Sequence, residues 1–156
     1  MEGILFKTCF LAATALTGLL CGASLDQSIK QLPARRVIGA KAFSEYAKAA
    51  DLKNGVLWYA LLGLGAALFS ITTAILVLLN YPQSTYSLPL YFAGLFAVCH
   101  TFCTTQAAPT YHSQKKIQDE SALEKLLNKF ERIQTFRSIF IVLNFMCFIW
   151  ALIIML

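Results

Sequence analysis

The sequence predicts an all-α membrane protein: a left-handed bundle of four transmembrane helices with two cytoplasmic amphipathic helical segments, forming one integral membrane domain over residues 1–156. Of its 156 residues, 58% are hydrophobic and 13% are charged, which excludes an ordinary water-soluble domain. A hydrocarbon core ~30 Å thick requires about 20 apolar residues in a helix. Four segments meet that length, at about residues 4–25, 56–79, 88–108 and 136–156.

The first apolar segment is expected to be a retained span. Lys7, followed by an apolar run ending in "LLCGAS", also fits a cleaved signal peptide, but the run is longer than a typical signal core and three more spans follow it. Gly18 and Gly22 form a GxxxG pattern here, and Gly63 with Ala67 repeats it in the second span. Small residues let helices approach closely in lipid, so we expect them to pack the first two spans together; alternatively, they leave room for a ligand.

The first connection is predicted to contain an amphipathic helix over about residues 33–52. Pro33 suits a helix start, apolar residues recur at helical spacing after it, and "DLKNG" provides a turn into the second span. Such a helix is expected to lie on the cytoplasmic surface of the membrane.

The third connection is predicted to carry the second amphipathic segment, over about residues 121–135. After "APTYHSQKK" ends the third span, "SALE" is typical of a capping box formed by Ser121 and Glu124. An apolar stripe then continues without Gly or Pro into the fourth span. One long helix is therefore expected from about Ser121 to the C-terminus.

Basic residues predict the orientation. They gather in the two long connections, whereas the short connection "NYPQSTYS" and the C-terminal end carry no charge. The positive-inside rule places both long connections in the cytoplasm and both termini on the other side, in a membrane that the sequence does not specify. We expect the basic face to contact anionic lipid headgroups. No aromatic residues are interleaved with these charges in the manner of a nucleic-acid site, so nucleic acid is excluded as a partner.

Polar residues inside the spans are the candidate functional residues. Counted from the cytoplasmic end, His100 of the third span and Asn144 of the fourth lie at nearly the same depth, and so do Thr17 and Gly63. An unpaired imidazole in hydrocarbon is costly, so we expect His100 to face the bundle interior and to bond Asn144. The pair is either a structural hydrogen bond between helices or the catalytic centre of an apolar pocket, with Thr17 and Gly63 binding the substrate.

A metal site is a third interpretation of His100, and the spacing of the nearby cysteines disfavours it. Cys99 and Cys103 share a helix face, but His100 lies off that face, and no second cluster supplies further ligands. All five cysteines lie within predicted spans, where we expect thiols that pack as small apolar groups. No metal and no cofactor is therefore predicted.

Three arginines are candidates for the cytoplasmic mouth of a pocket. Arg35 and Arg36 follow the first span, and Arg137 begins the fourth at about the level where the third ends. They are either interfacial anchors or groups that hold the polar end of an amphipathic molecule entering from the inner leaflet.

Three stretches carry a family resemblance: "GLLCGASLDQSIKQLPAR", "AFSEYAKAADLKNGVLWY" and "RIQTFRSIFIVLNFMCFIWAL". In order and layout they resemble the small four-helix membrane family that includes anthrone oxygenases. The resemblance implies a four-helix fold and, for the enzymes, oxygenation of a polycyclic phenolic substrate at an activated carbon without a bound metal or flavin. The matching positions are Pro33, Arg35 and Arg137; no catalytic histidine is matched. The membrane glutathione transferases fit less well, because "RRVIGAKAFSEY" lacks the His and Asn of their first connection.

Two functions are consistent with the sequence. The first is an enzyme or carrier that handles a small apolar, aromatic or lipid-like molecule between the helices. The second is a non-catalytic scaffold or regulatory subunit that assembles with itself or with another membrane protein. A fold alone does not separate them; an apolar cavity beside His100 would favour the first.

Overall fold

The structure is a computed structural model that describes residues 2–156, and its regular structure is helical throughout that range. Four long helices dominate it: α1 (Glu2–Asp26), α4 (Gly55–Asn80), α5 (Ser87–Ser113) and α6 (Glu120–Met155). Each contains one of the predicted apolar segments and is long and apolar enough to cross a membrane. The prediction of an all-helical bundle with four candidate spans is therefore confirmed.

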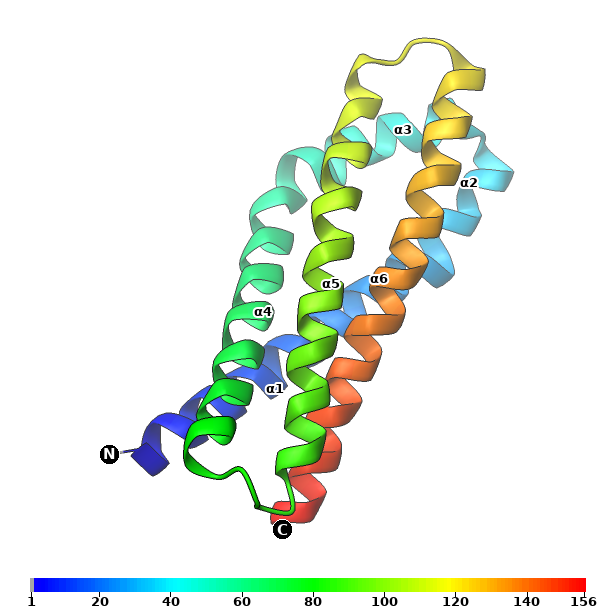
Figure 1. The fold of residues 1–156 in the computed structure, drawn as a ribbon. Helices are drawn as coiled ribbons and strands as arrows, with labels where there is room; N and C mark the ends of the chain where they lie inside the picture. Colours follow the sequence, from blue (N-terminus) through cyan, green and yellow to red (C-terminus); the bar gives the residue numbers. More distant parts are fainter. Residues whose placement is uncertain (1) are drawn as a thin grey trace.

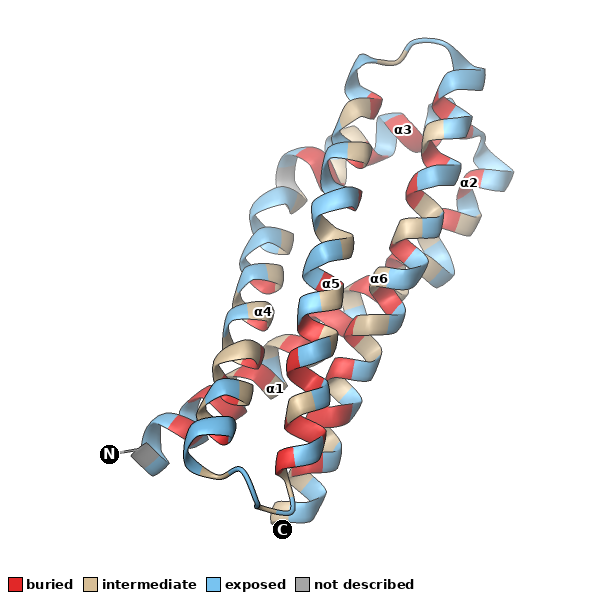
Figure 2. Cartoon of the chain, viewed as in Figure 1, coloured by how far each residue is buried: buried red, intermediate tan, exposed pale blue. Residues whose placement is uncertain are grey.

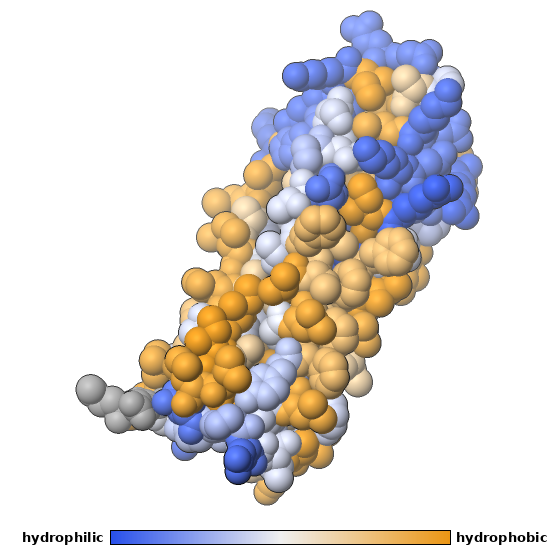
Figure 3. All heavy atoms as spheres, in the orientation of Figure 1, coloured by the Kyte–Doolittle hydropathy of each residue, from blue (hydrophilic) through white to orange (hydrophobic). Residues whose placement is uncertain are grey.

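The four long helices form a closed ring of neighbours. Helices α1 and α5 each pack against both α4 and α6 (Figure 1). The chain begins and ends at one end of the bundle, and both long connections lie at the other (Figure 1). The surface is apolar along most of the bundle and hydrophilic around those connections (Figure 3), because the basic residues gather there.

The outer faces of the long helices are apolar. Leu64, Phe102 and Ile153 are among the large apolar side chains that remain exposed, while buried residues face the neighbouring helices (Figure 2). Water would penalise so much exposed apolar surface, whereas lipid would not. This pattern agrees with helices that are long enough to span a membrane.

The first connection is divided differently from the prediction. Helix α1 continues through the π-helical turn η1 (Gln27–Gln31) into α2 (Leu32–Ile38), so Pro33 lies near the start of a continuation and does not open a separate helix. The break comes at Gly39, whose φ of 85° is readily adopted only without a Cβ. Helix α3 (Ala40–Ala49) and the π-helical turn η2 (Ala50–Asn54) follow, and α3 buries Phe43 and Ala47 against the basic end of the bundle.

The third connection is shorter than predicted. Helix α5 continues past the predicted end near residue 108 and through Pro109 to Ser113, and the short 3₁₀ turn η3 (Gln114–Lys116) follows. The cap of α6 is Asp119, whose carboxylate accepts a hydrogen bond of 2.7 Å from the backbone N–H of Ala122. The capping box predicted at Ser121 was therefore wrong by two residues, but α6 does run unbroken to Met155.

Small residues allow close approach at positions other than those predicted. Gly18 faces Phe145 of α6 and not the second span, and a Cβ at Gly22 would meet no atom within 4 Å. Helices α1 and α4 instead approach where Gly65 lies against Leu16. Nearer the basic end, Ser24 of α1 and Ser138 of α6 are hydrogen-bonded at 2.8 Å. Helix α1 therefore leans from α4 toward α6 along its length (Figure 1).

Candidate functional site

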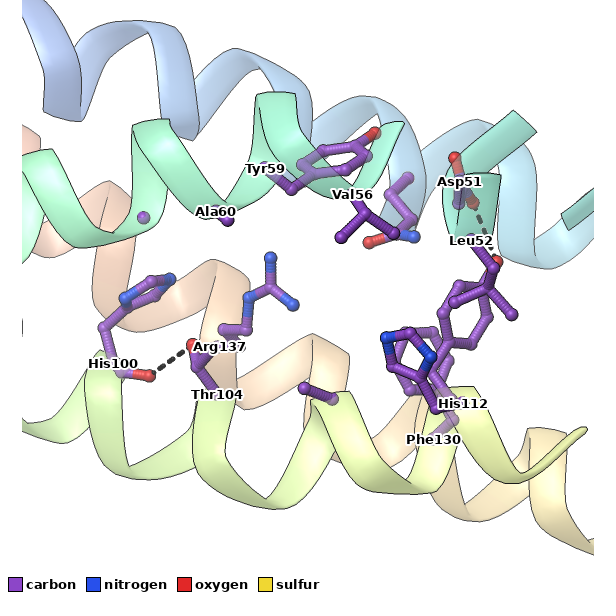
Figure 4. Close-up of a pocket in the computed structure, with 14 residues that line it drawn as sticks. Asp51, Leu52, Val56, Tyr59, Ala60, His100, Thr104, His112, Phe130 and Arg137 are labelled. Carbon is purple, nitrogen blue, oxygen red and sulfur yellow. Dashed lines mark hydrogen bonds between the residues drawn. The ribbon is translucent and has the colours of Figure 1, made fainter. Parts of the chain in front are cut away.

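A cavity of about 200 Å³ lies between α4, α5 and α6 in the half of the bundle nearer the basic end (Figure 4). It forms where α1 has moved away from α4, so that only Gln27 of η1 reaches it from that side. Its wall on α5 extends from His100 to His112, which is thirteen residues, or ~18 Å of helix. Most of the other lining residues are apolar or aromatic. Besides Gln27 and His100, the lining comprises Asp51 and Leu52 of η2; Val56, Tyr59, Ala60 and Gly63 of α4; Thr104, Ala108, Tyr111 and His112 of α5; and Phe130 and Arg137 of α6.

His100 lies at the inner end of the cavity and is 3% exposed. Its ring points into the space between α4 and α5 (Figure 4), and its Nε2 has no hydrogen-bond partner among the residues that the structure describes. The hydroxyl of Thr104 donates to the backbone carbonyl of His100 at 2.9 Å and so leaves the imidazole free. His100 can therefore offer a hydrogen-bonding nitrogen to a bound molecule.

The predicted layer of His100, Asn144 and Thr17 does not form. Asn144 Nδ2 donates to the hydroxyl of Ser70 on α4 at 3.3 Å, and Thr17 Oγ1 donates to the carbonyl of Ala13 in its own helix at 2.7 Å. Neither residue lines the cavity. The inferred equal depth does not hold either: Phe96 of α5 stacks on Phe140 of α6, so Asn144 lies nearer the termini than His100 does. A count of helical rise also does not fix which face of each helix turns toward which neighbour. The expected bond between His100 and Asn144 was therefore wrong.

Arg137 enters the same cavity from α6 (Figure 4). Its Nε is buried without a hydrogen-bond partner, and no carboxylate in the described part of the chain lies within 4.0 Å of its guanidinium. A guanidinium always carries its charge in proteins, so the cavity contains a cation that the described chain does not pair.

Arg35 and Arg36 do not belong to this cavity. Both donate to Glu131 of α6, at 2.7 and 2.9 Å, and Arg35 also donates to Asn128 at 2.8 Å. These contacts fasten α2 to α6 on the outside of the basic end. The mouth predicted to contain all three arginines therefore contains Arg137 alone.

Gly63 lines the cavity on the α4 side. A Cβ added to it would meet no atom within 4 Å, so open space lies beside this position. Val56, Ala60 and Ala108 line the cavity and are also exposed, which places an opening between α4 and α5. A ligand can therefore enter through the side of the bundle as well as from its basic end.

The basic end of the cavity has a polar group, Asp51, that the sequence places among the polar residues of the cytoplasmic interface but not among the candidate site residues. Asp51 of η2 is 9% exposed, and its Oδ2 accepts a hydrogen bond of 2.7 Å from the hydroxyl of Tyr111. Burial raises the pKa of the Asp51 carboxyl, and the bond from Tyr111 opposes that rise. π-Helical turns occur frequently at functional sites, and both η1 and η2 contribute to this lining.

The cysteines lie away from the site. All five are free thiols, and Cys99 and Cys103 line a separate apolar groove between α5 and α6 with Phe102 and Phe136. Within residues 2–156, no three His, Cys, Asp or Glu side chains are grouped so that they could hold a metal ion.

Comparisons of this chain with family models, with curated proteins and with solved structures give no match. The resemblance to the anthrone oxygenase family thus stays a prediction from the sequence. The functional argument depends on the cavity and its residues.

Proposed function

We propose that this protein binds a small apolar, aromatic or lipid-like molecule within its helical bundle. The observation that supports this most directly is the pairing of an apolar cavity with two polar side chains, His100 and Arg137, that the described chain leaves without partners. Ligand sites typically have this composition, with mostly apolar walls and a few polar groups that orient the ligand.

A structural role explains His100 less well. A histidine that serves packing alone usually satisfies its nitrogens, because a buried polar group without a partner costs roughly 1–3 kcal/mol. Asn144 lies outside the cavity, and its Nδ2 bonds Ser70 across the bundle while its Oδ1 is buried without a described partner. His100 lines the cavity, and its buried Nε2 has no partner in the described chain, as we expect for a group that bonds a ligand or acts on it as a base.

The size of the cavity limits the enclosed part of the ligand. An apolar cavity of roughly 150 Å³ holds a benzene molecule. At about 200 Å³, this cavity holds one ring with substituents, and a larger ligand would extend through the opening between α4 and α5. Because that opening faces outward from helices that can span a membrane, we expect the ligand to arrive from the lipid.

Native mass spectrometry of the protein in mild detergent, with organic extraction of what co-purifies, tests this function. We expect a stoichiometric aromatic or lipid-like molecule that is lost in His100→Ala and retained in Cys99→Ala. Cys99 is the matched control because it adjoins His100 in sequence but lines the separate outer groove.

Two results would contradict the proposal. One is a ligand that His100→Ala retains as well as the control does. The other is a protein that carries only a partner subunit and binds none of a panel of one-ring and two-ring aromatic compounds, which would support the scaffold function instead.

A further inference from the structure

We infer that the molecule bound in this cavity carries an ionised oxygen acid, a carboxylate or a phenolate, and that Arg137 is its counter-charge. This inference rests on the proposed function and adds to it the charge of the ligand.

Three acidic side chains at the basic end of the bundle have other partners. Glu131, on the same helix, binds Arg35 and Arg36. Asp26 binds Lys30 and Gln31 at the end of α1. Asp51, the acid in the cavity lining, accepts a hydrogen bond from Tyr111 and lies more than 4.0 Å from any described basic nitrogen. The described chain therefore gives Arg137 no ion pair.

An unpaired guanidinium beside apolar walls is energetically unfavourable. Removing a charge from water costs several kcal/mol in real proteins, and only a close partner of opposite charge with good geometry offsets that cost. A carboxylate fits best because its two oxygens can accept two parallel N–H bonds from the guanidinium. A ligand anion would thus offset the cost of placing this charge beside apolar walls.

The other walls specify what accompanies the charge. Val56, Tyr59 and Phe130 surround the space with apolar and aromatic surface, and the volume of about 200 Å³ suits a compact ring. Together with the guanidinium, they favour a small aromatic acid over a neutral hydrocarbon or an amine. His112, which is exposed, and His100 are the other basic side chains in the lining, and neither would repel an anion.

Binding of two ligands that have nearly equal shape but different charge tests the inference separately from the proposed function. We would measure binding of 2-naphthoate and of 2-naphthamide to the protein in nanodiscs of neutral phosphatidylcholine near neutral pH. The naphthoate should bind at least about tenfold tighter, which is a modest value for a charge-assisted pair. Arg137→Gln should remove this preference while keeping amide binding, and Arg137→Lys should retain part of it.

Arg132→Gln is the matched control. Arg132 is an exposed arginine of the same helix and does not line the cavity, so its loss changes the net charge equally and should leave the preference intact.

The remaining outcomes distinguish the two proposals. Equal binding of acid and amide, or a preference that persists in Arg137→Gln, would overturn the inference while leaving the proposed function in place. Failure of both compounds to bind would count against the proposed function itself. Displacement of naphthoate by added phosphatidylglycerol would overturn the inference by showing that Arg137 pairs with a lipid phosphate.

Discussion

The interface between α4 and α5 is closed in one half of the bundle and open in the other, and each half has a glycine at its centre. In the half near the termini, a Cβ added to Gly94 of α5 would lie only 2.7 Å from the Cβ of Ala74 on α4. In the half near the basic end, a Cβ added to Gly63 of α4 would meet nothing within 4 Å. The same residue type thus allows contact at one site and leaves space at the other.

The polar residues follow this division. Aromatic side chains fill the closed half, where Phe6, Phe10 and Phe148 pack with Tyr81 and Tyr86. The open half contains His100 and Arg137 without partners in the described chain. A bundle held only by packing would not need two such groups beside the apolar, partly enclosed space between α4, α5 and α6. The comparison therefore indicates that the open half is shaped for a ligand and the closed half for stability.

The largest effect is expected from Gly94→Ala. The added methyl group cannot fit against Ala74 unless the helices separate, and overpacking of this kind typically costs about 1–3 kcal/mol. We expect the free energy of unfolding, measured by titration with SDS in mixed micelles, to fall by that amount. Gly22→Ala is the control, because its Cβ would meet no atom and alanine favours a helix. Equal stability of the two variants would contradict the close contact.

Gly63→Leu should affect binding more than folding. The Cβ would meet no atom within 4 Å and the rest of the side chain would occupy cavity volume, so the unfolding free energy should stay within about 1 kcal/mol of the original value. Binding of 2-naphthoate should weaken at least about tenfold, or ~1.4 kcal/mol, because the volume of one ring is lost. Isothermal titration in nanodiscs measures this loss. Unchanged affinity would show that the ligand lies elsewhere.

The sequence was sufficient to predict the helices, but not which of their faces meet. Hydropathy and length located all four long helices, because a span needs a minimum apolar length. The partner of Asn144 could not be predicted, because Ser70 is one small hydroxyl in an apolar run and gives no periodic signal. Arg35 and Arg36 were grouped with Arg137 by depth alone, whereas Glu131 holds them on another side of α6. Rotation of each helix about its axis is set by packing, which a single sequence does not display.

His100→Leu should stabilise the protein when no ligand is present. The buried Nε2 of His100 has no described partner, and an unsatisfied buried polar group costs roughly 1–3 kcal/mol. The change replaces it with an apolar side chain of similar size. We expect a gain of about 1 kcal/mol in SDS titration together with weaker ligand binding. Asn144→Leu is the contrast, since it breaks the bond to Ser70 and should destabilise the bundle. Destabilisation by His100→Leu would instead identify a structural role.

The smallest effect is expected at the basic end of the cavity, in the pH dependence of stability. Burial raises the pKa of Asp51 above its ordinary value of 3.8, so the folded protein binds this proton more tightly than the unfolded chain does. The unfolding free energy should therefore fall as pH rises from 3.8 to the raised pKa, and change no further through this group above it. Asp51→Asn should remove that part of the slope. Tyr111→Phe should steepen it, because the lost hydrogen bond of 2.7 Å favours the ionised carboxylate. Identical pH profiles for the original protein and Asp51→Asn would mean that water reaches this carboxyl freely, and that the basic end of the cavity is open to solvent.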